Sequence, residues 1–500
     1  MSSHILAIDQ GTSSTKTIIC DGKGAVLASA TVPLKSAYGP DGTAEQDPED
    51  IFTSVIDAVA SVVEIFEAER NISRTEIECV GIANQRETFV LWDKSGIPLH
   101  NAVLWQCKRS VEICNELKEA GTEHEVRERS GLIIDPYFSG TKVSWLRRHS
   151  KKISAAHERG EIWFGTVDSW LLNRLTDGAV HATDHTNASR TMMLNIKSLK
   201  WDPELTRILE IPNIRLPAVY PSAYDYGASD FSGIFREPVP ITALIGDSHA
   251  SFFGGRCFTP GSAKATLGTG CSILLNAGDA TPPSYPTTMT TVGYSLPGRT
   301  DYALEGIIVS AGAVLTWLQR ELGLYDDPSE LESIAEALED SGGVTVVPGH
   351  AGLGAPFWTM DARGSIHGLT FGSNKSHILR GALESIAFQI RAIFDAITGE
   401  SGIKCSSLRV DGGISKNGFV TQWIADTLGV PVNIFSLPNI TAQGAALLAG
   451  IGAGVYAGIK EVAALKQDES RIEPGKNRTR ALLAYKTWHD VVSEVLRTNQ

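Results

Sequence analysis

The sequence predicts an α/β protein of two related domains, with a ligand-binding cleft between them. One observation is a repeated outline: a strand, a turn rich in glycine and hydroxyl residues, and a second strand occur near the N-terminus and again from about residue 255. The other is that a helix and a further strand follow this hairpin in both halves. A cleft between two such domains is a natural place for a ligand.

The first domain is predicted to begin with strands at residues 4–9, 15–20 and 24–32. An Asp-Gly pair at the second turn favours a hairpin, because it tolerates the positive φ of a tight turn. A helix is expected from Pro48, with Asp47 as its cap and apolar residues at helical spacing. Strands at 77–85 and 88–93 come next, and this order differs from the alternating strands and helices of a Rossmann unit.

The second half repeats this pattern. Residues 261–278 read as strand, Gly-Thr-Gly turn and strand, and residues 408–435 read as strand, Gly-Gly turn, helix and strand. Glycines and a proline cluster at 252–260, where we expect the hinge. The predicted domains are therefore residues 1–253 and 254–500.

The composition is that of an ordinary globular protein, with 42% hydrophobic and 20% charged residues. The net charge of −13 argues against binding of nucleic acid or of an anionic membrane, since both require concentrated Lys and Arg. Seven cysteines without a CxxC pair favour a reducing compartment. No basic leader with an apolar core and no long apolar run is present, so a cytoplasmic protein without membrane insertion is expected.

The turn sequence DQGTSSTK, residues 9–16, is the first candidate phosphate site. It lacks the two glycines of a Walker loop, but turn N–H groups and hydroxyls can converge on a phosphate, and Lys16 adds charge. Asp9, at the end of a strand, would then be placed to hold Mg²⁺ through water. An ordinary polar hairpin is the simpler interpretation of this turn alone. The second turn LGTG, residues 267–270, favours a phosphate clamp formed by both domains.

Arg86, Glu87 and Asp247 are candidates for an acceptor site. A donor fork beside a carboxylate can bind vicinal hydroxyls of a polyol, although Arg and Glu in a loop are most often solvated. Asp247 follows an apolar strand and precedes a helix, a position that suits a general base or an N-cap.

Two glycine-containing segments have equally open interpretations. DGGISKN, residues 411–417, joins a strand to a helix, and its glycines allow either close ligand approach or tight packing. SAGAVLTW, residues 310–317, begins a helix that either faces a nucleotide or is only packed.

Eight motifs occur in a fixed order along the chain: DQGTSSTK, NQRET, DPYFSGTK, TDHTNASRTM, GDSHA, GTGC, GLGAPFW and DGGISKN. With these motifs, residues 5–456 resemble the FGGY family of carbohydrate kinases, most closely its glycerol-phosphorylating members. The resemblance implies the actin-like ATPase fold, in which two ribonuclease-H-like domains close on ATP and Mg²⁺ across an interdomain cleft. It also implies ATP-dependent phosphorylation of glycerol to sn-glycerol 3-phosphate, and a homo-oligomer, either a dimer or a tetramer.

The resemblance also implies roles for individual residues. Asp247 matches the catalytic base. The acceptor site is matched by Arg86, Glu87, Trp105, Tyr137 and Asp247. The nucleotide site is matched by Thr12, Ser13, Ser14, Lys16, Thr269, Gly312, Gly413 and Asn417. Ser248 in the acceptor site and Thr316 in the nucleotide site stand where relatives often carry glutamine.

Other departures concern specificity and control. Ser272 follows GTGC, where glycerol-phosphorylating members typically have Phe, so a longer polyol such as erythritol is the alternative acceptor. Residues 225–240 lack the loop that binds fructose bisphosphate in some relatives and the histidine that is phosphorylated in others. A non-catalytic ATP-dependent switch is a further alternative, but a pure switch has no need of an acceptor set such as Arg86, Glu87 and Asp247.

Overall fold

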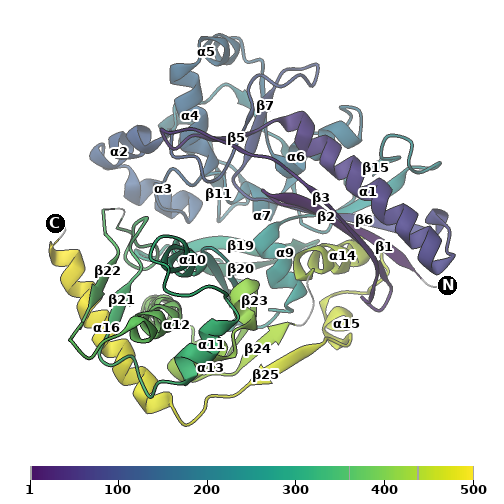
Figure 1. Cartoon of the computed structure of the whole chain (residues 1–500). Helices are drawn as coiled ribbons and strands as arrows, with labels where there is room; N and C mark the ends of the chain where they lie inside the picture. Colours follow the sequence, from purple (N-terminus) through teal and green to yellow (C-terminus); the bar gives the residue numbers. More distant parts are fainter. Residues whose placement is uncertain (1–2, 360, 436–438, 499–500) are drawn as a thin grey trace.

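The computed structural model describes residues 3–359, 361–435 and 439–498. The chain forms two α/β halves that meet at the centre of the molecule, the N-terminal half in purple and blue and the C-terminal half in green and yellow (Figure 1). Each half is organised around a mixed β-sheet. The limits 1–253 and 254–500 stay a prediction, and their outer ends at residues 1–2 and 499–500 lie outside the described residues.

The sheet of the N-terminal half has six strands in the order β15-β16-β6-β1-β2-β3. Its strands are β1 (His4–Gln10), β2 (Ser14–Asp21), β3 (Val26–Pro33), β6 (Ile77–Asn84), β15 (Ala228–Ser229) and β16 (Val239–Gly246). β1, β2 and β3 pair antiparallel, whereas β6 runs parallel to both β1 and β16. The three opening strands therefore form where the sequence predicts them.

The sheet of the C-terminal half has the order β19-β20-β18-β17-β23-β24-β25. Its strands are β17 (Ser262–Leu267), β18 (Cys271–Gly278), β19 (Met289–Leu296), β20 (Arg299–Ile308), β23 (Ser407–Asp411), β24 (Val432–Phe435) and β25 (Glu469–Ile472). β17 and β18 form an antiparallel hairpin, and β23 runs parallel to β17. The order β20-β18-β17-β23-β24 thus repeats β3-β2-β1-β6-β16, which confirms the internal repeat.

A third sheet, inserted in the N-terminal half, has the order β13-β9-β7-β8-β5-β4. Its strands are β4 (Ala37–Tyr38), β5 (Ala44–Gln46), β7 (Phe89–Trp92), β8 (Ala102–Val103), β9 (Ile162–Thr166) and β13 (Ile214–Arg215). The predicted strand at 88–93 is therefore present as β7, but it belongs to a different sheet from β6. The polar segment between β6 and β7 directs the chain from one sheet to the other.

The remaining strands form three short pairs: β10 (Ala182–Asp184) with β14 (Ala218–Tyr220), β11 (Leu194–Asn195) with β12 (Lys200–Trp201), and β21 (Thr345–Val347) with β22 (Ser365–His367). The helices of the N-terminal half are α1 (Pro48–Arg70), α2 (Val111–Glu119), α3 (Glu123–Ser130), α4 (Ser139–His149), α5 (Lys151–Glu158), α6 (Val167–Leu175), α7 (His185–Ala188), α8 (Pro203–Ile208) and α9 (Asp247–Gly254). Those of the C-terminal half are α10 (Gly312–Arg320), α11 (Glu330–Glu336), α12 (Lys375–Ser401), α13 (Gly418–Leu428), α14 (Ile440–Gly452), α15 (Ile459–Ala464) and α16 (Arg478–Thr498).

Helix α1 covers one face of the N-terminal sheet. Its start is the predicted one, because the Asp47 carboxylate accepts a hydrogen bond from the Glu49 N–H at 2.8 Å and Pro48 occupies the first turn. Its apolar stripe, including Ile51 and Val55, is buried against the sheet.

Helices α9 and α14 lie at the centre of the molecule, where the two halves meet (Figure 1). Apolar side chains of both helices share one core with β1, β6, β16 and with β18 and β20 of the other sheet. The helices cross closely at glycine, since a Cβ atom on Gly444 would lie 1.8 Å from the Ala250 carbonyl oxygen. Phe252, at the start of the predicted hinge, is buried within α9, so this part of the hinge segment is packed helix.

Candidate active site

The parallel strands of each sheet end at a common edge, and the candidate residues follow these ends. In the N-terminal sheet, Gln10 of β1 pairs with Asn84 of β6, and Asn84 pairs with Gly246 of β16. This register places Asp9, Arg86 and Asp247 at one edge of the sheet. Ligands of open α/β sheets bind outside the carboxyl ends of the parallel strands.

The two Gly-Thr turns have the geometry of tight hairpins. In the first turn, the Gly11 N–H donates to the Ser14 carbonyl at 3.0 Å. In the second, the Gly268 N–H donates to the Gly270 carbonyl at 2.9 Å, and the N–H groups of Ala311 and Ala313 donate to the Thr269 carbonyl. The second turn is thereby attached to the start of α10. Ser13 is exposed at the tip of the first turn, while Thr12 and Ser14 are half-buried.

Asp9 lies near enough to two other carboxylates, Asp247 in its own half and Asp411 in the other half, for their charges to act on it. Burial, together with the charges of Asp247 and Asp411, raises the pKa of Asp9 to about 7 against the opposing effect of Lys16. Asp411 ends β23 in the other half and forms an ion pair with Lys264, which is buried. A cluster of carboxylates that repel one another is a favourable place for a cation.

A buried network of charges joins the two halves. The Arg86 guanidinium contacts Asp247 through Nε at 3.3 Å and donates from its terminal nitrogen to Glu305 Oε1 at 3.0 Å. Arg190 donates to Glu87 Oε1 at 2.5 Å and also pairs with Glu305. The side chains of Arg190 and Glu305 are 0% exposed, so each charge depends on its partners within the network.

Electrostatics at Asp247 suit proton transfer. Its half-buried carboxylate accepts from the Ser248 N–H at 2.6 Å and from the Ser248 hydroxyl at 3.4 Å. Removal from bulk water raises the pKa of Asp247 above its usual value, and Arg86 opposes this shift. A carboxylate with a raised pKa is a stronger general base.

Glu87 has an unusual backbone conformation. Its φ is 60°, in the left-handed region that favours glycine and costs other residues about 1 kcal/mol or more. The Ser139 hydroxyl, at the start of α4, donates to the Glu87 carbonyl at 2.7 Å, and Arg190 holds its side chain. Such strain persists where surrounding contacts impose it, which is typical of binding sites.

Trp105 and Tyr137 form an aromatic wall, with ring centroids 5.4 Å apart in an edge-to-face arrangement. The Trp105 indole N–H donates to the Thr12 hydroxyl at 3.0 Å. The Thr12 hydroxyl in turn donates to Gln85 at 3.2 Å. The wall and the first Gly-Thr turn are therefore directly connected.

A cavity of about 500 Å³ lies beside the second Gly-Thr turn. It is lined by Thr269, Ala313, Thr316, Trp317, Arg320 and Glu321. Gly412 and Gly413 directly follow the neighbouring strand β23. A Cβ atom on Gly413 would meet no heavy atom within 4 Å, so packing does not require glycine there, whereas at Gly412 it would lie 2.3 Å from the Leu267 carbonyl oxygen. Open space at Gly413 leaves room for close approach of a ligand.

Two of the nucleotide-site candidates make local hydrogen bonds. The Asn417 side chain caps α13 by accepting from the Val420 N–H at 3.0 Å. The Thr316 hydroxyl donates to the Gly312 carbonyl at 3.2 Å, one turn earlier in α10. These contacts are those of a helix cap and of a helical hydroxyl.

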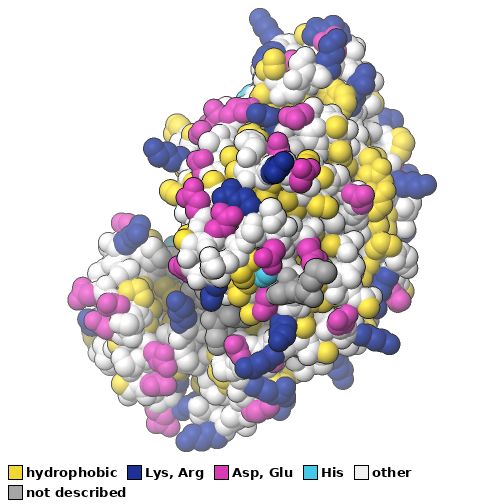
Figure 2. Space-filling view, turned by 90° about the vertical axis from the view of Figure 1, so that its right-hand side faces the viewer, with side chains coloured by type: hydrophobic (Ala, Val, Ile, Leu, Met, Phe, Trp, Pro, Cys, Tyr) yellow, Lys and Arg dark blue, Asp and Glu magenta, His cyan; other side chains and the backbone are white. Residues whose placement is uncertain are grey.

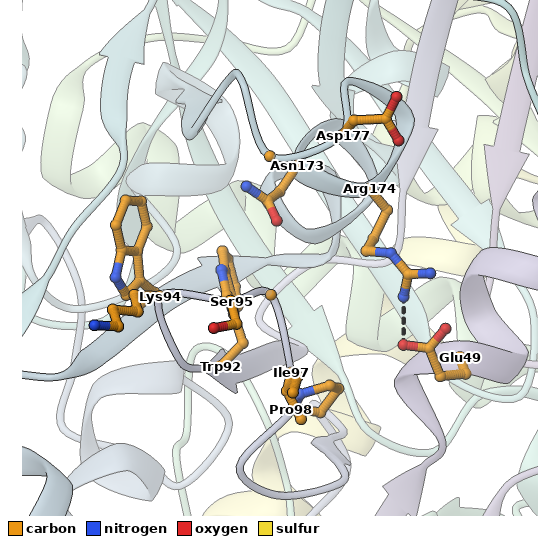
Figure 3. Close-up of a pocket in the computed structure, with 12 residues that line it drawn as sticks. Glu49, Trp92, Lys94, Ser95, Ile97, Pro98, Asn173, Arg174 and Asp177 are labelled. Atoms are coloured by element: carbon orange, nitrogen blue, oxygen red, sulfur yellow. Dashed lines mark hydrogen bonds and ion pairs between the residues drawn. The ribbon is translucent and has the colours of Figure 1, made fainter.

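A larger cavity of about 700 Å³ lies elsewhere in the N-terminal half, between the 93–98 loop and the end of α6 (Figure 3). Its lining includes Trp92, Lys94 and Asp177, and Arg174 points toward Glu49, with which it forms an ion pair. Among the described residues that line it, none is a predicted site residue.

The part of the chain that the structure describes, residues 3–359, 361–435 and 439–498, contains neither a metal site formed by protein groups alone nor a membrane-spanning helix. No group of three or more His, Cys, Asp or Glu side chains in this part of the chain could by itself hold a metal ion. Mg²⁺ commonly uses one or two carboxylates together with substrate phosphates, so the Asp9 carboxylate fits such a site without a protein cage. None of the described helices is long and apolar enough to cross a membrane.

Charged side chains on the face shown in Figure 2 are mixed, and neither sign forms one broad patch there. At the candidate site, positive charge comes from Lys16, Lys264 and Arg86.

Comparison with known protein families assigns the chain. Residues 4–254 match the model of the N-terminal domain of the FGGY family of carbohydrate kinases, and residues 263–453 match the model of its C-terminal domain. The chain belongs to the FGGY family. The resemblance in its motifs is thus confirmed, together with the actin-like ATPase fold that it implies.

Curated relatives of this FGGY chain cover nearly its whole length. A protein from Carboxydothermus hydrogenoformans named glycerol kinase is 44% identical over 98% of this chain and 97% of its own. Another from Thermotoga maritima, named glycerol kinase 2, is 43% identical over 99% of both chains.

Solved structures give the same family fold. A Plasmodium falciparum glycerol kinase with ADP matches with a TM-score of 0.91 and 32% identity, covering 99% of this chain and 98% of its own. A gluconate kinase from Lactobacillus acidophilus matches with a TM-score of 0.88, but at 22% identity this likeness shows the fold alone.

Several residues that contact the candidate site residues were not singled out individually from the sequence. They are Gln85, Lys142, Arg190, Lys264, Glu305 and Asp411. Glu305 and Lys264 offered a signal, because a lone charge within an apolar strand requires a buried partner. The partner of Glu305 could not be predicted from the sequence, since Arg86 and Glu305 are 219 residues apart.

Proposed function

We propose that this chain transfers the γ-phosphoryl group of ATP to glycerol and produces sn-glycerol 3-phosphate. The observation that carries the proposal is the Arg86–Asp247 contact of 3.3 Å at the ends of parallel strands in a chain with glycerol kinase relatives at 43–44% identity over its length. A charged donor beside a carboxylate can bind one hydroxyl of a polyol and accept the proton of its neighbour.

In this proposal, Asp247 is the general base. An alcohol is a poor nucleophile, so its proton must move to a base as the oxygen attacks phosphorus. Arg86 and Glu87 bind the other hydroxyls, Ser248 supports Asp247, and the wall of Trp105 and Tyr137 covers the carbon chain. These contacts hold the reacting oxygen in line with the phosphoryl group, and such positioning is a large part of the catalytic effect.

The phosphates of ATP are proposed to bind between the two Gly-Thr turns. Candidates for this role are Thr12, Ser13, Ser14 and Lys16 on one side and Thr269, Gly312, Thr316, Gly413 and Asn417 on the other. The open space at Gly413 and the cavity beside Thr269 and Thr316 fit a nucleotide. Asp9 would hold Mg²⁺, which when bound neutralises charge on the phosphates.

The test measures ADP release with glycerol, C4 and C5 polyols, and ketoses as acceptors. The proposal expects glycerol to give the highest kcat/KM in the presence of ATP and Mg²⁺. A C4 polyol with a kcat/KM far above that of glycerol would contradict the assignment of glycerol, although the kinase activity itself would stand.

A second candidate acceptor is a longer polyol such as erythritol, and Ser272 favours it. The Ser272 hydroxyl donates to Glu305 Oε1 at 3.1 Å, and the same oxygen accepts from Arg86. The small polar side chain of Ser272, close to Arg86, leaves space and hydrogen-bonding capacity that a phenylalanine would remove. Ser272→Phe is expected to lower kcat/KM for erythritol at least tenfold and that for glycerol less than threefold. Equal effects on both polyols would contradict the candidate.

We also propose a cytoplasmic location and a homo-oligomer of two or four copies. All seven cysteines are free and six of them are buried, which supports a reducing compartment. Light scattering of the purified protein would test the oligomeric state, and a monomeric mass would contradict it.

A further inference from the structure

Lys142 lies in the first turn of α4, and its side chain is completely buried at 0% exposure. Lysine is rarely buried without partners, because desolvation of an ammonium group is costly. Within the described chain, Lys142 forms no ion pair with a carboxylate. Its Nζ instead donates to three backbone carbonyls, those of Leu104 at 3.1 Å, Trp105 at 3.2 Å and Tyr137 at 2.9 Å. The three donors of the ammonium group are matched by three acceptors.

Two of these carbonyls belong to the aromatic wall. Trp105 lies in the loop after β8, whereas Tyr137 precedes α4. The two residues are therefore distant in sequence, and the ammonium group holds their backbones together. Their rings make the 5.4 Å edge-to-face contact of the wall.

Trp105 also connects Lys142 to the first Gly-Thr turn. The Trp105 backbone N–H donates to the Thr88 hydroxyl at 3.1 Å, and its indole N–H donates to the Thr12 hydroxyl at 3.0 Å. A shift of the Trp105 backbone would move the indole and leave the Thr12 hydroxyl without its donor. Lys142 is thus linked to both the acceptor side and the nucleotide side of the site.

We infer that Lys142 is a positioning residue for phosphoryl transfer, whose ammonium group fixes the Trp105–Tyr137 wall and, through Trp105, the Thr12 hydroxyl. This inference rests on the proposed polyol kinase activity. Lys142 does not touch the reacting atoms. Its removal would leave three buried carbonyls without donors, and the wall would rearrange to satisfy them.

The electrostatics around Lys142 are consistent with this role. Burial lowers the pKa of the ammonium to about 8, and Cys107, Glu87, Asp135 and Cys114 face it and act in the opposite direction. The group is therefore mostly charged at neutral pH and can supply all three hydrogen bonds.

The first test compares Lys142→Met with wild type and with Lys152→Ala, a control on the exposed face of α5. Methionine keeps most of the volume but has no donor. We expect Lys142→Met to raise KM for glycerol at least tenfold and to lower kcat, while the control stays within twofold of wild type. Values of kcat and of KM for both substrates within twofold of wild type in Lys142→Met would overturn the inference, whatever its melting temperature.

The second test is chemical rescue of Lys142→Ala, which removes three carbons and the ammonium group. Added n-propylammonium is expected to lower the KM for glycerol of this variant at least threefold, and neutral 1-propanol is expected to have no effect. Equal rescue by both compounds would show that the lysine only fills space, and this would overturn the inference. Absence of glycerol phosphorylation by the wild-type protein would instead contradict the proposed function, so the two failures are distinguishable.

Discussion

At the scale of single residues, the site depends on charges whose partners lie in other elements. Asp247 ends up 3.3 Å from Arg86, and Arg86 contacts Glu305 in the other half of the molecule. Burial works to raise the pKa of Glu305, but the ion pairs with Arg190 and Arg86 outweigh it and lower the pKa, so this carboxyl stays ionised. The guanidinium groups of Arg86 and Arg190 are thereby held in place at the proposed acceptor site.

Asp247→Asn tests the general base. The amide keeps the shape of the carboxylate but cannot accept a proton, so phosphoryl transfer is expected to fall at least 10²-fold, the usual scale of general-base catalysis. Binding of ATP, measured by isothermal titration calorimetry, is expected to stay within threefold of wild type. Retained transfer would remove Asp247 from the mechanism.

Lys16→Ala tests the first Gly-Thr turn. Lys16 lies opposite Asp9 in the register of the β1–β2 hairpin. Its charge is proposed to neutralise phosphate charge. Steady-state kinetics are expected to show a higher KM for ATP, a lower kcat, or both, with KM for glycerol little changed. An enzyme with unchanged kinetics would mean that this turn is an ordinary polar hairpin.

At the scale of elements, the packing of helices and strands places buried polar groups and glycines where the sequence gives little warning. Asp168 in α6 is fully buried and accepts from the hydroxyls of Thr166 at 2.5 Å and Thr183 at 2.6 Å. Burial, with a contribution from the charge of Asp184, raises the pKa of Asp168 to about 7. The α9–α14 crossing is a second case, because it requires glycine at the point of contact.

Asp168→Asn is expected to change how stability depends on pH. Between about pH 4 and pH 7 the unfolded carboxyl is ionised while the folded one keeps its proton, so the free energy of unfolding of the wild type falls as pH rises, by up to about 4 kcal/mol from this group. The free energy of unfolding of the variant does not fall in this way, because asparagine has no ionisable carboxyl group. Urea unfolding at several pH values should show the advantage of Asp168→Asn growing up to pH 7 and then levelling. The exposed Asp57→Asn serves as control, and a difference that is constant with pH would contradict the assignment.

Gly444→Ala is expected to destabilise the protein by about 2 kcal/mol or more, because the added methyl group would overlap the Ala250 carbonyl and force α9 and α14 apart. Gly399→Ala is the matched control within helix α12, where a Cβ atom would meet nothing within 4 Å. There the higher helix propensity of alanine should raise stability by up to about 1 kcal/mol. Thermal unfolding measures both variants, and similar effects at the two positions would contradict the close crossing.

At the scale of the whole molecule, the two halves are joined by more than the chain connection. Helix α14 belongs to the C-terminal half in sequence, yet its side chains share a core with β1 and β6 of the N-terminal sheet. The charges of Arg86, Arg190 and Glu305 cross the same boundary. The proposed acceptor site therefore includes residues of both halves.

A fragment of residues 1–253 is expected to fail to fold into a stable domain. Without α14, the buried face of the N-terminal sheet that includes Ile5, Ala7 and Ala83 would be exposed to water. Expression of the fragment should give aggregated or dye-binding material, in contrast to the full chain under the same conditions. A monomeric fragment with cooperative unfolding would show that the first half is independent of α14.

The local elements and the family could be predicted from the sequence alone. The hairpin strands, the capped helix α1 and the repeat of this order follow from short-range patterns of apolar residues, Asp-Gly turns and caps, and the family follows from motifs that are contiguous in the chain. Contacts between residues that are distant in sequence, in contrast, are visible only in the tertiary structure. The pairing of Glu305 with Arg86, the contact of Trp105 with Thr12 and the buried position of Lys142 depend on how whole elements pack. No local pattern encodes these contacts, because ion pairs and buried hydrogen bonds are set by three-dimensional packing across hundreds of residues.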